Sequence, residues 1–217
     1  LDGSMVLTGK KALDYSGGVS AEDERGIGGV ERIMGPNGQA QFIAENLGDA
    51  YRILFDWYRG TYRMKEETIP RKLTTSDPST RSILSYPYRS DKDEGLKTVG
   101  DIFDRTKNPE RKKPFAIRAV MHAVIDQDID FLERFSGLRD GESSVVWESH
   151  IGGWPVCLIG IESRQQQRQG RIPMDGPEQW TGGTLFPTSS KKVARAINSA
   201  SGNRPVVVLA NLSGFDG

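Results

Sequence analysis

The sequence is poor in the residues that form disulfides and metal sites. Cysteine occurs once in 217 residues, at Cys157, and histidine occurs twice, at His122 and His150. A single cysteine excludes a disulfide within the chain, and no CxxC pair or histidine cluster has the spacing of a metal site. We therefore expect no bound metal. Because one unpaired thiol is typical of a reducing compartment, we also expect a cytoplasmic protein.

Net charge and long apolar runs are absent as well. Lysine and arginine together number 29, as do aspartate and glutamate, so no overall field attracts a nucleic acid or an anionic membrane. The longest apolar run, Val206 to Ala210, is far shorter than the ~20 residues that span a bilayer. We expect neither nucleic acid nor membrane as a partner. The chain begins at Leu1 without methionine, and we take it as a fragment of a longer protein.

Hydrophobic periodicity predicts three helices. The first starts at Asn46 and places six apolar residues on one face, the second follows Asn108-Pro109 and runs to Asp126, and the third is capped by Thr188 or Ser189. In the third helix we expect Lys191, Lys192 and Arg195 to face outward. The apolar face of the first helix consists of Leu47, Ala50, Tyr51, Leu54, Phe55 and Tyr58.

Extended segments lie on either side of the third predicted helix. Residues 143–149 and 155–161 are rich in β-forming side chains and are joined by Ile151-Gly152-Gly153, which predicts a hairpin. Val206 to Ala210 is a continuous apolar run, which is typical of a strand buried on both faces. Short strands with compact turns are expected before residue 46, and the proline-containing stretch from Lys65 to Lys107 reads as a surface linker.

Familiar nucleotide and hydrolase motifs are missing. Gly9-Lys10 lacks the glycine spacing and the Ser or Thr of a phosphate loop, and the glycines from Gly26 to Gly29 lack the last position of the dinucleotide fingerprint. Ser189 stands outside any G-x-S-x-G elbow. The glycine-containing loop after Val206 to Ala210 remains, at the carboxyl end of a strand, where α/β folds bind ligands.

Four stretches of the chain resemble a known family. Together they are similar to the carboxyltransferase component of biotin-dependent acyl-CoA carboxylases, and they are GGVSAEDERGIGG (17–29), MGPNGQAQFIAENLGDA (34–50), IGGWPVCLIGIESR (151–164) and TLFPTSSKKVARAINSASGNRPVVVLANLSGFDG (184–217). The last is the most specific, since its proline, serines, helix, valine-rich strand and G-F-x-G loop occur in the family's order. The insertion at 164–183 and the run at 111–121 look more like the multidomain acetyl-CoA carboxylases.

The resemblance implies an α/β fold, a partial crotonase/ClpP-like superhelix of β-β-α units. Residues 1–67 would end the first carboxyltransferase domain, 68–113 would link the domains, and 114–217 would begin the second. In the family the active site forms between the first domain of one subunit and the second domain of its partner. The implied assembly is a homodimer that works with biotin carboxylase and biotin carboxyl carrier modules.

The implied reaction moves a carboxyl group from carboxybiotin to the α-carbon of an acyl-CoA. Acetyl-CoA is the first candidate substrate, and propionyl-CoA or longer acyl-CoA are alternatives. In this chemistry biotin is the base, so the protein stabilises two oxyanions, which backbone N–H groups can do. The family's main oxyanion glycines lie before Leu1 and after Gly217, and we therefore expect the isolated fragment to be inactive.

The residues carried over by the resemblance are expected to contact substrate rather than to react. They are Leu185, Phe186, Ser189, Lys192, Ser213, Gly214, Phe215 and Gly217. Ser213 replaces an arginine that meets the malonyl carboxylate in the eukaryotic-type enzymes, and Leu185-Phe186 replaces a Trp-His pair. These departures leave the acyl preference open.

Two other functions remain open at the level of sequence. The shared β-β-α unit is also compatible with a crotonase-type CoA hydratase or decarboxylase, which needs no biotin. A non-catalytic scaffold domain is the third possibility, because Ser213 and Leu185-Phe186 depart from the family's pocket.

Overall fold

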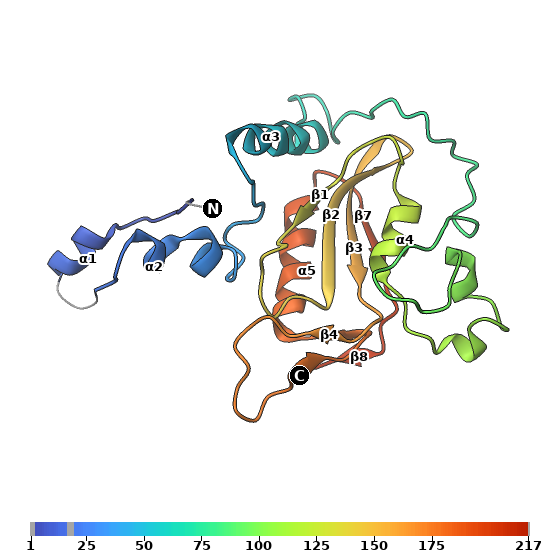
Figure 1. The fold of residues 1–217 in the computed structure, drawn as a ribbon. Coiled ribbons are helices and arrows are strands. Elements are labelled where there is room, and N and C mark those ends of the chain that lie inside the picture. Colours follow the sequence, from blue (N-terminus) through green and yellow to red (C-terminus); the bar gives the residue numbers. More distant parts are fainter. Residues whose placement is uncertain (1–2, 17–19, 217) are drawn as a thin grey trace.

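The computed structural model describes residues 3–16 and 20–216, and its centre is a four-stranded sheet (Figure 1). The strand order is β1-β2-β3-β7. The strands are β1 (Leu132–Arg134), β2 (Ser144–Ile151), β3 (Trp154–Ile161) and β7 (Val206–Leu209). β2 runs antiparallel to both β1 and β3, whereas β7 runs parallel to β3. The strand, strand, helix, strand order expected from the sequence is thus confirmed.

The β2–β3 hairpin turns at two glycines with left-handed backbone angles. Gly152 has φ +60° and Gly153 has φ +80°, and the Asp126 carboxylate accepts a hydrogen bond of 2.7 Å from the backbone N–H of each. A Cβ at Gly153 would lie 2.1 Å from the Leu73 carbonyl oxygen. Glycine is therefore required at this position by both backbone conformation and space.

One helix covers each face of the sheet (Figure 1). Helix α5 (Pro187–Ala200) buries Ala196 and Ala200 against Val146, Cys157 and other residues of β2 and β3, whereas α4 (Ile117–Val124) packs on the opposite face. The prediction that β7 is buried on both faces is wrong. Val208 is 49% exposed, and the other three residues of β7 are only half-buried.

The second predicted helix is shorter than expected. The proline after Asn108 starts only a 3-10 turn, Pro109–Arg111, and α4 begins later, at Ile117. Glu110 and Arg111 have positive φ angles, which interrupt a continuous helix. α4 therefore has only eight residues.

Part of the segment interpreted as a surface linker belongs to the core. Tyr88, Leu96, Val99 and Ile102 are buried against Ala116, Ala119 and Ala123 of α4 and the residues before it. The Tyr88 hydroxyl also accepts a hydrogen bond of 2.7 Å from the Ala116 backbone N–H. A short 3-10 helix, Val99–Ile102, carries two of these apolar residues. This stretch is thus packed on α4 and the residue before it, and the domain boundaries stay a prediction.

The segment before residue 46 forms helices instead of the predicted short strands. They are α1 (Lys10–Ser16), α2 (Glu24–Gly28) and a π-helical turn (Val30–Met34), and only an isolated bridge joins Ser4 to Gly29. The Asp23 carboxylate caps α2 by accepting a hydrogen bond of 2.8 Å from the Gly26 N–H. The closely spaced glycines favour turns, but the Asp23 cap stabilises a helix here.

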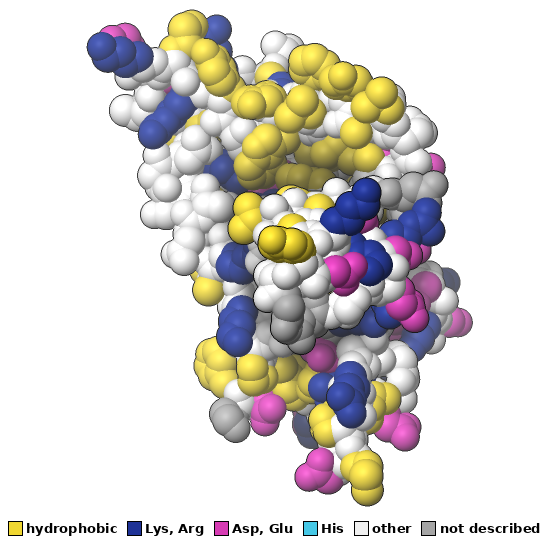
Figure 2. Space-filling view, turned by 90° about the vertical axis from the view of Figure 1, so that its left-hand side faces the viewer, with side chains coloured by type: hydrophobic (Ala, Val, Ile, Leu, Met, Phe, Trp, Pro, Cys, Tyr) yellow, Lys and Arg dark blue, Asp and Glu magenta, His cyan; other side chains and the backbone are white. Residues whose placement is uncertain are grey.

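Helix α3 (Leu47–Thr61) is confirmed, and its apolar face is exposed. The Asn46 side chain accepts a hydrogen bond of 3.0 Å from the Asp49 N–H and so caps the first turn. Figure 2 shows hydrophobic side chains gathered around a hollow at the upper end of this face of the molecule. The exposed apolar residues of α3 are Leu47, Tyr51, Leu54, Phe55 and Tyr58. Within the described residues, no helix has the length and apolar character needed to cross a membrane.

Candidate functional site at the carboxyl edge of the sheet

Two stretches that the sequence marks as candidate site residues pair with each other in space. Strand β6 (Thr184–Leu185) lies parallel to β8 (Gly214–Phe215), with Thr184 opposite Gly214 and Leu185 opposite Phe215. The Asp216 N–H donates a hydrogen bond of 3.0 Å to the Leu185 carbonyl oxygen. β8 follows the carboxyl end of β7 in the chain, which is where α/β folds bind ligands.

Gly183, which sequence reasoning missed, holds the two stretches together. Its carbonyl oxygen accepts a hydrogen bond of 2.6 Å from the Ser213 N–H, and its own N–H donates one of 2.7 Å to the Glu162 carbonyl oxygen. Gly183 has φ +68°, and an added Cβ would lie 2.8 Å from the Asn211 carbonyl oxygen. The Gly182-Gly183 pair immediately before Thr184 is the signal that could have indicated this close approach.

Gly214 leaves open space where a substrate could approach the backbone. No heavy atom lies within 4 Å of the position that a Cβ would occupy, and the Gly214 N–H makes only a long contact of 3.4 Å to the Gly183 carbonyl oxygen. The neighbouring Phe215 is 72% exposed. The loop thus presents a backbone N–H beside an apolar ring. Gly217, the last predicted site residue, lies outside the described residues.

Leu185 of β6 and the following residue, Phe186, pack inward. Phe186 is buried, and its ring centre lies 4.3 Å from that of Trp180. Leu185 is half-buried and packs against the core cluster beneath α5. Phe186 is therefore a packing residue and presents no surface to a ligand.

Ser189 closes the first turn of α5. Its Oγ accepts a hydrogen bond of 2.8 Å from the Phe186 N–H and donates one of 3.0 Å to the Phe186 carbonyl oxygen. The side chain is fully buried. Phe186 is thus the N-cap residue, in place of the predicted Thr188 or Ser189. In this chain Ser189 fixes the junction between β6 and α5 and has no exposed oxygen.

The outward-facing position predicted for Lys192 is wrong. The side chain is buried, and its Nζ donates hydrogen bonds to the carbonyl oxygens of Ser144 and Gly141, at 2.6 Å and 3.3 Å. Burial lowers the pKa of Lys192 to about 8. Lys192 therefore ties α5 to the start of β2. The helical spacing of apolar residues predicted an exposed lysine. It could not show that the Gly141 and Ser144 carbonyl groups, about fifty residues earlier in the chain, lie against this side of α5.

An apolar hollow of about 400 Å³ adjoins the same edge of the sheet. It opens beside Ala210 and Asn211, the residues that lead from β7 into the candidate loop. Its other lining residues are mainly apolar, and they include Phe103, Phe115, Val120 and Leu209 together with Arg111. The hollow provides space for a hydrocarbon chain close to the loop.

Other titratable groups are poor candidates for catalysis. Cys157 is fully buried, and burial raises the pKa of its thiol to about 12. Burial lowers the pKa of both His122 and His150. His122 packs against the rings of Phe131 and Trp147. In the described part of the chain, no cluster of His, Cys, Asp and Glu side chains could hold a metal ion.

Sequence relatives agree with the family resemblance. The chain is 24% identical over its whole length to an acetyl-CoA carboxylase of Dictyostelium discoideum. It is 25% identical over 98% of its length to an acetyl-CoA carboxylase of Saccharomyces cerevisiae. The chain spans only 9% of the length of each of these relatives.

Solved structures with a similar fold include two of transcarboxylase 12S. One, determined with hydrolysed methylmalonyl-coenzyme A bound, superimposes with a TM-score of 0.66 at 19% identity and covers 99% of this chain and 34% of the other. The second, with methylmalonyl-coenzyme A and methylmalonic acid bound, has a TM-score of 0.65 at 19% identity and covers 99% of this chain and 35% of the other. The chain therefore has the mixed α/β crotonase-like fold expected from the sequence.

The pattern that defines the carboxyl transferase domain matches residues 2–217. This match includes the whole β2-β3-α5-β7 unit and the paired strands β6 and β8. The chain thus belongs to the carboxyl transferase domain family.

Proposed function

We propose that this chain forms part of a carboxyltransferase that moves a carboxyl group from carboxybiotin to the α-carbon of an acyl-CoA. The observation that carries the proposal is the pairing of Leu185 with Phe215, which places the open Gly214 backbone beside an exposed ring at the carboxyl edge of the sheet. Family membership supports the reaction class. Because the chain spans a small part of its curated relatives, the activity is proposed for the complete protein.

The residues of the loop suit a planar ligand that develops negative charge. The Gly214 N–H is held only by a 3.4 Å contact, so it can turn toward a carbonyl oxygen of the ligand, and no side chain blocks the approach. Carboxybiotin, when bound, supplies both the carboxyl group and the base that removes the α-proton. Phe215 covers one side of the ligand and excludes water, and the Ser213 and Asp216 backbone bonds keep the loop in place.

The acyl group is proposed to enter the apolar hollow beside Asn211. Acetyl-CoA is the first substrate to consider, since the matched relatives are acetyl-CoA carboxylases. The volume of about 400 Å³ also admits propionyl and longer chains. Ser213, a small residue where the eukaryotic-type enzymes carry arginine, adds no charge that would select a short product. We therefore propose a preference that extends beyond acetyl-CoA.

The complete site is proposed to need further protein. The exposed Phe215 ring and the open space at Gly214 leave one side of the loop uncovered. A second copy of the carboxyltransferase would cover it, in a homodimer. The biotin carrier domain would deliver the cofactor from a biotin carboxylase module. The cytoplasmic location stays a prediction.

The test is carboxyl transfer by the full-length protein with biotinylated carrier and radiolabelled bicarbonate. We expect acyl-CoA-dependent incorporation of label with acetyl-CoA, propionyl-CoA and a longer acyl-CoA, and loss of incorporation when avidin sequesters biotin. Full activity on CoA thioesters in the presence of avidin would instead indicate a hydratase or decarboxylase. A folded protein that binds no CoA at millimolar concentration in calorimetry would indicate a scaffold.

A further inference from the structure

Among its described lining residues, the apolar hollow beside Asn211 has one charged group, Arg111. The volume of about 400 Å³ is within the range of sites for small organic molecules. Apart from Arg111 and Asn211, the described lining residues are all apolar. The Asn211 side-chain amide already donates to the Ser163 hydroxyl, at 3.0 Å. Arg111 is therefore the group on which the polar end of a ligand can bind.

The Arg111 guanidinium has no counter-ion within the chain. Its carbon lies 5.9 Å from the centre of the Phe103 ring, and it has no hydrogen-bond or ion-pair partner in the described part of the chain. The neighbouring Glu110 carboxylate is held by Lys112. Cations also outnumber carboxylates along residues 101–113, where the cations are Arg105, Lys107, Arg111, Lys112 and Lys113 and the carboxylates are Asp101, Asp104 and Glu110. The segment that carries Arg111 thus attracts an anionic group.

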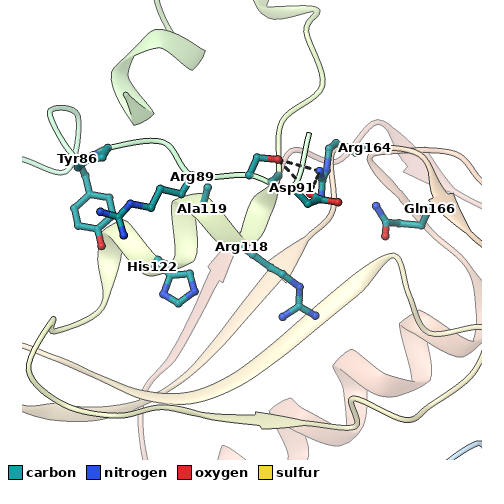
Figure 3. A pocket seen from close by; sticks show the side chains of 11 residues that line it. Tyr86, Arg89, Asp91, Arg118, Ala119, His122, Arg164 and Gln166 are labelled. Carbon is teal, nitrogen blue, oxygen red and sulfur yellow. Dashed lines mark hydrogen bonds and ion pairs between the residues drawn. The ribbon is translucent and has the colours of Figure 1, made fainter. Parts of the chain in front are cut away.

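The larger hollow of about 610 Å³ over the outer side of α4 differs in its charges (Figure 3). Two of the arginines that line it are already paired with carboxylates of the chain. The pairs are Arg164 with Asp91, Glu94 and Glu162, and Arg118 with Glu133. Figure 3 shows Asp91 against Arg164, whereas Arg89 is turned toward Tyr86. The chain itself therefore neutralises this larger hollow, unlike the hollow at Arg111.

An unusual turn holds Arg111 at the wall of its hollow. Glu110 and Arg111 have φ +55° and +58°, a left-handed conformation that non-glycine residues rarely adopt. The buried Asn108 fixes this turn. Its amide donates a hydrogen bond of 2.8 Å to the Ile102 carbonyl oxygen, and its side-chain oxygen accepts one of 2.8 Å from the Lys113 N–H. Strained backbone of this kind clusters at ligand-binding sites.

We propose that the hollow binds a free fatty acid, with its carboxylate on Arg111 and its hydrocarbon chain against Phe115 and Leu209. A guanidinium binds a carboxylate through two parallel N–H···O bonds. One guanidinium balances the single charge of a carboxylate, whereas a phosphate monoester carries more negative charge. The apolar wall stabilises the hydrocarbon chain by removing it from water.

The fatty-acid site overlaps the space in which the acyl group of an acyl-CoA is proposed to lie. A bound fatty acid therefore competes with that acyl group, and this consequence alone rests on the proposed function. Binding of the fatty acid itself requires only the apolar hollow and the guanidinium in its wall.

Isothermal titration calorimetry of the full-length protein with octanoate and with octan-1-ol tests the site. We expect octanoate to bind about tenfold more tightly than octan-1-ol, because only octanoate makes a charge-assisted contact. Arg111→Gln should weaken octanoate binding about tenfold and leave octan-1-ol binding unchanged. Arg105→Gln, at another exposed arginine of the same segment, is the matched control and should leave both unchanged.

Two further variants separate binding from folding. Arg111→Gly removes the guanidinium and suits φ +58°, so octanoate binding should weaken equally while the melting temperature does not fall. Ala210→Trp, at an exposed lining residue, should fill the hollow and weaken both probes. Absence of octanoate binding, or equal octanoate binding in Arg111→Gln and Arg105→Gln, would overturn the proposal. None of these readouts requires carboxyl transfer, so failure of this site and failure of the proposed function are distinguishable.

Discussion

The Arg204 guanidinium carbon lies 5.2 Å from the centre of the Trp57 ring, and this contact docks α3 on the sheet. Arg134 approaches the same ring at 5.2 Å. The Glu148 carboxylate lies between the two arginines, at 3.0 Å from Arg134 and 2.6 Å from Arg204. All three charged side chains are nearly buried. The face of α3 that packs is therefore the one that carries Trp57.

Glu148→Gln should destabilise the protein by about 3 kcal/mol, since it leaves two buried guanidinium groups without a countercharge. Urea unfolding followed by circular dichroism measures the effect. Hydrogen exchange should also become faster in α3, because its docking depends on this pair of arginines. Glu66→Gln, at an exposed carboxylate, is the control. Equal stability of the two variants would contradict a structural role for Glu148.

Gly214→Val should reduce carboxyl transfer by the full-length protein about 100-fold, the typical cost of displacing a bound substrate by about 1 Å. The melting temperature should hardly change, because no heavy atom lies within 4 Å of the new Cβ. Steady-state rates and a thermal scan give the two values. Gly60→Val, far from the loop, should retain full activity. An unchanged rate in Gly214→Val would show that the loop is only a turn.

Lys192 makes stability depend on pH above neutrality. Its pKa is about 8 in the folded chain and ordinarily 10.5, so between these values the unfolded chain holds a proton that the folded chain has released. Stability should therefore rise as pH increases from 8 to 10.5, by at most about 3 kcal/mol.

The comparison is with Lys192→Met, whose side chain is also long and unbranched but has no titrating group. Unfolding free energies at pH 7.5 and pH 10 give the slope for each protein. The variant should be less stable at pH 7.5, since the carbonyl oxygens of Ser144 and Gly141 lose a donor. Parallel pH profiles for the two proteins would mean that Lys192 does not titrate in this range.

Cys157 should resist thiol reagents in the native state. It is fully buried, and its pKa of about 12 leaves almost no thiolate at pH 8. Labelling with a thiol-reactive dye should therefore be slow without denaturant and complete in 6 M guanidinium. The control is a Ser201→Cys variant, whose exposed thiol should react at once. Rapid labelling of native Cys157 would contradict the packed core.

The parts of the fold that depend on neighbouring residues could be predicted. Asn46 and the helical spacing of the apolar residues predicted α3. Gly152-Gly153 between two β-rich runs predicted the hairpin. The Asn46 cap lies within the first turn of α3, and the two strands of the hairpin pair across a two-glycine turn, which Asp126 also holds from a distant segment. The same reasoning failed before residue 46, where glycine spacing suggested turns but a local Asp23 cap stabilises a helix.

The candidate site was predictable only in part. Ser213, Gly214 and Phe215 were identified by the loop after an apolar strand and by the family resemblance. Gly183 was missed, because its role depends on how closely Asn211 and Ser213 pass in three dimensions.

Local chemistry in the chain thus dictates where its strands and helices form, because caps, turns and hydrophobic period act over a few residues. Contacts between distant segments decide which helix face is buried. They turn Lys192 inward, expose the apolar face of α3 and bring Leu185 beside Phe215. The physical reason is that burial and backbone pairing depend on the surface that an element meets, and that surface belongs to another part of the chain.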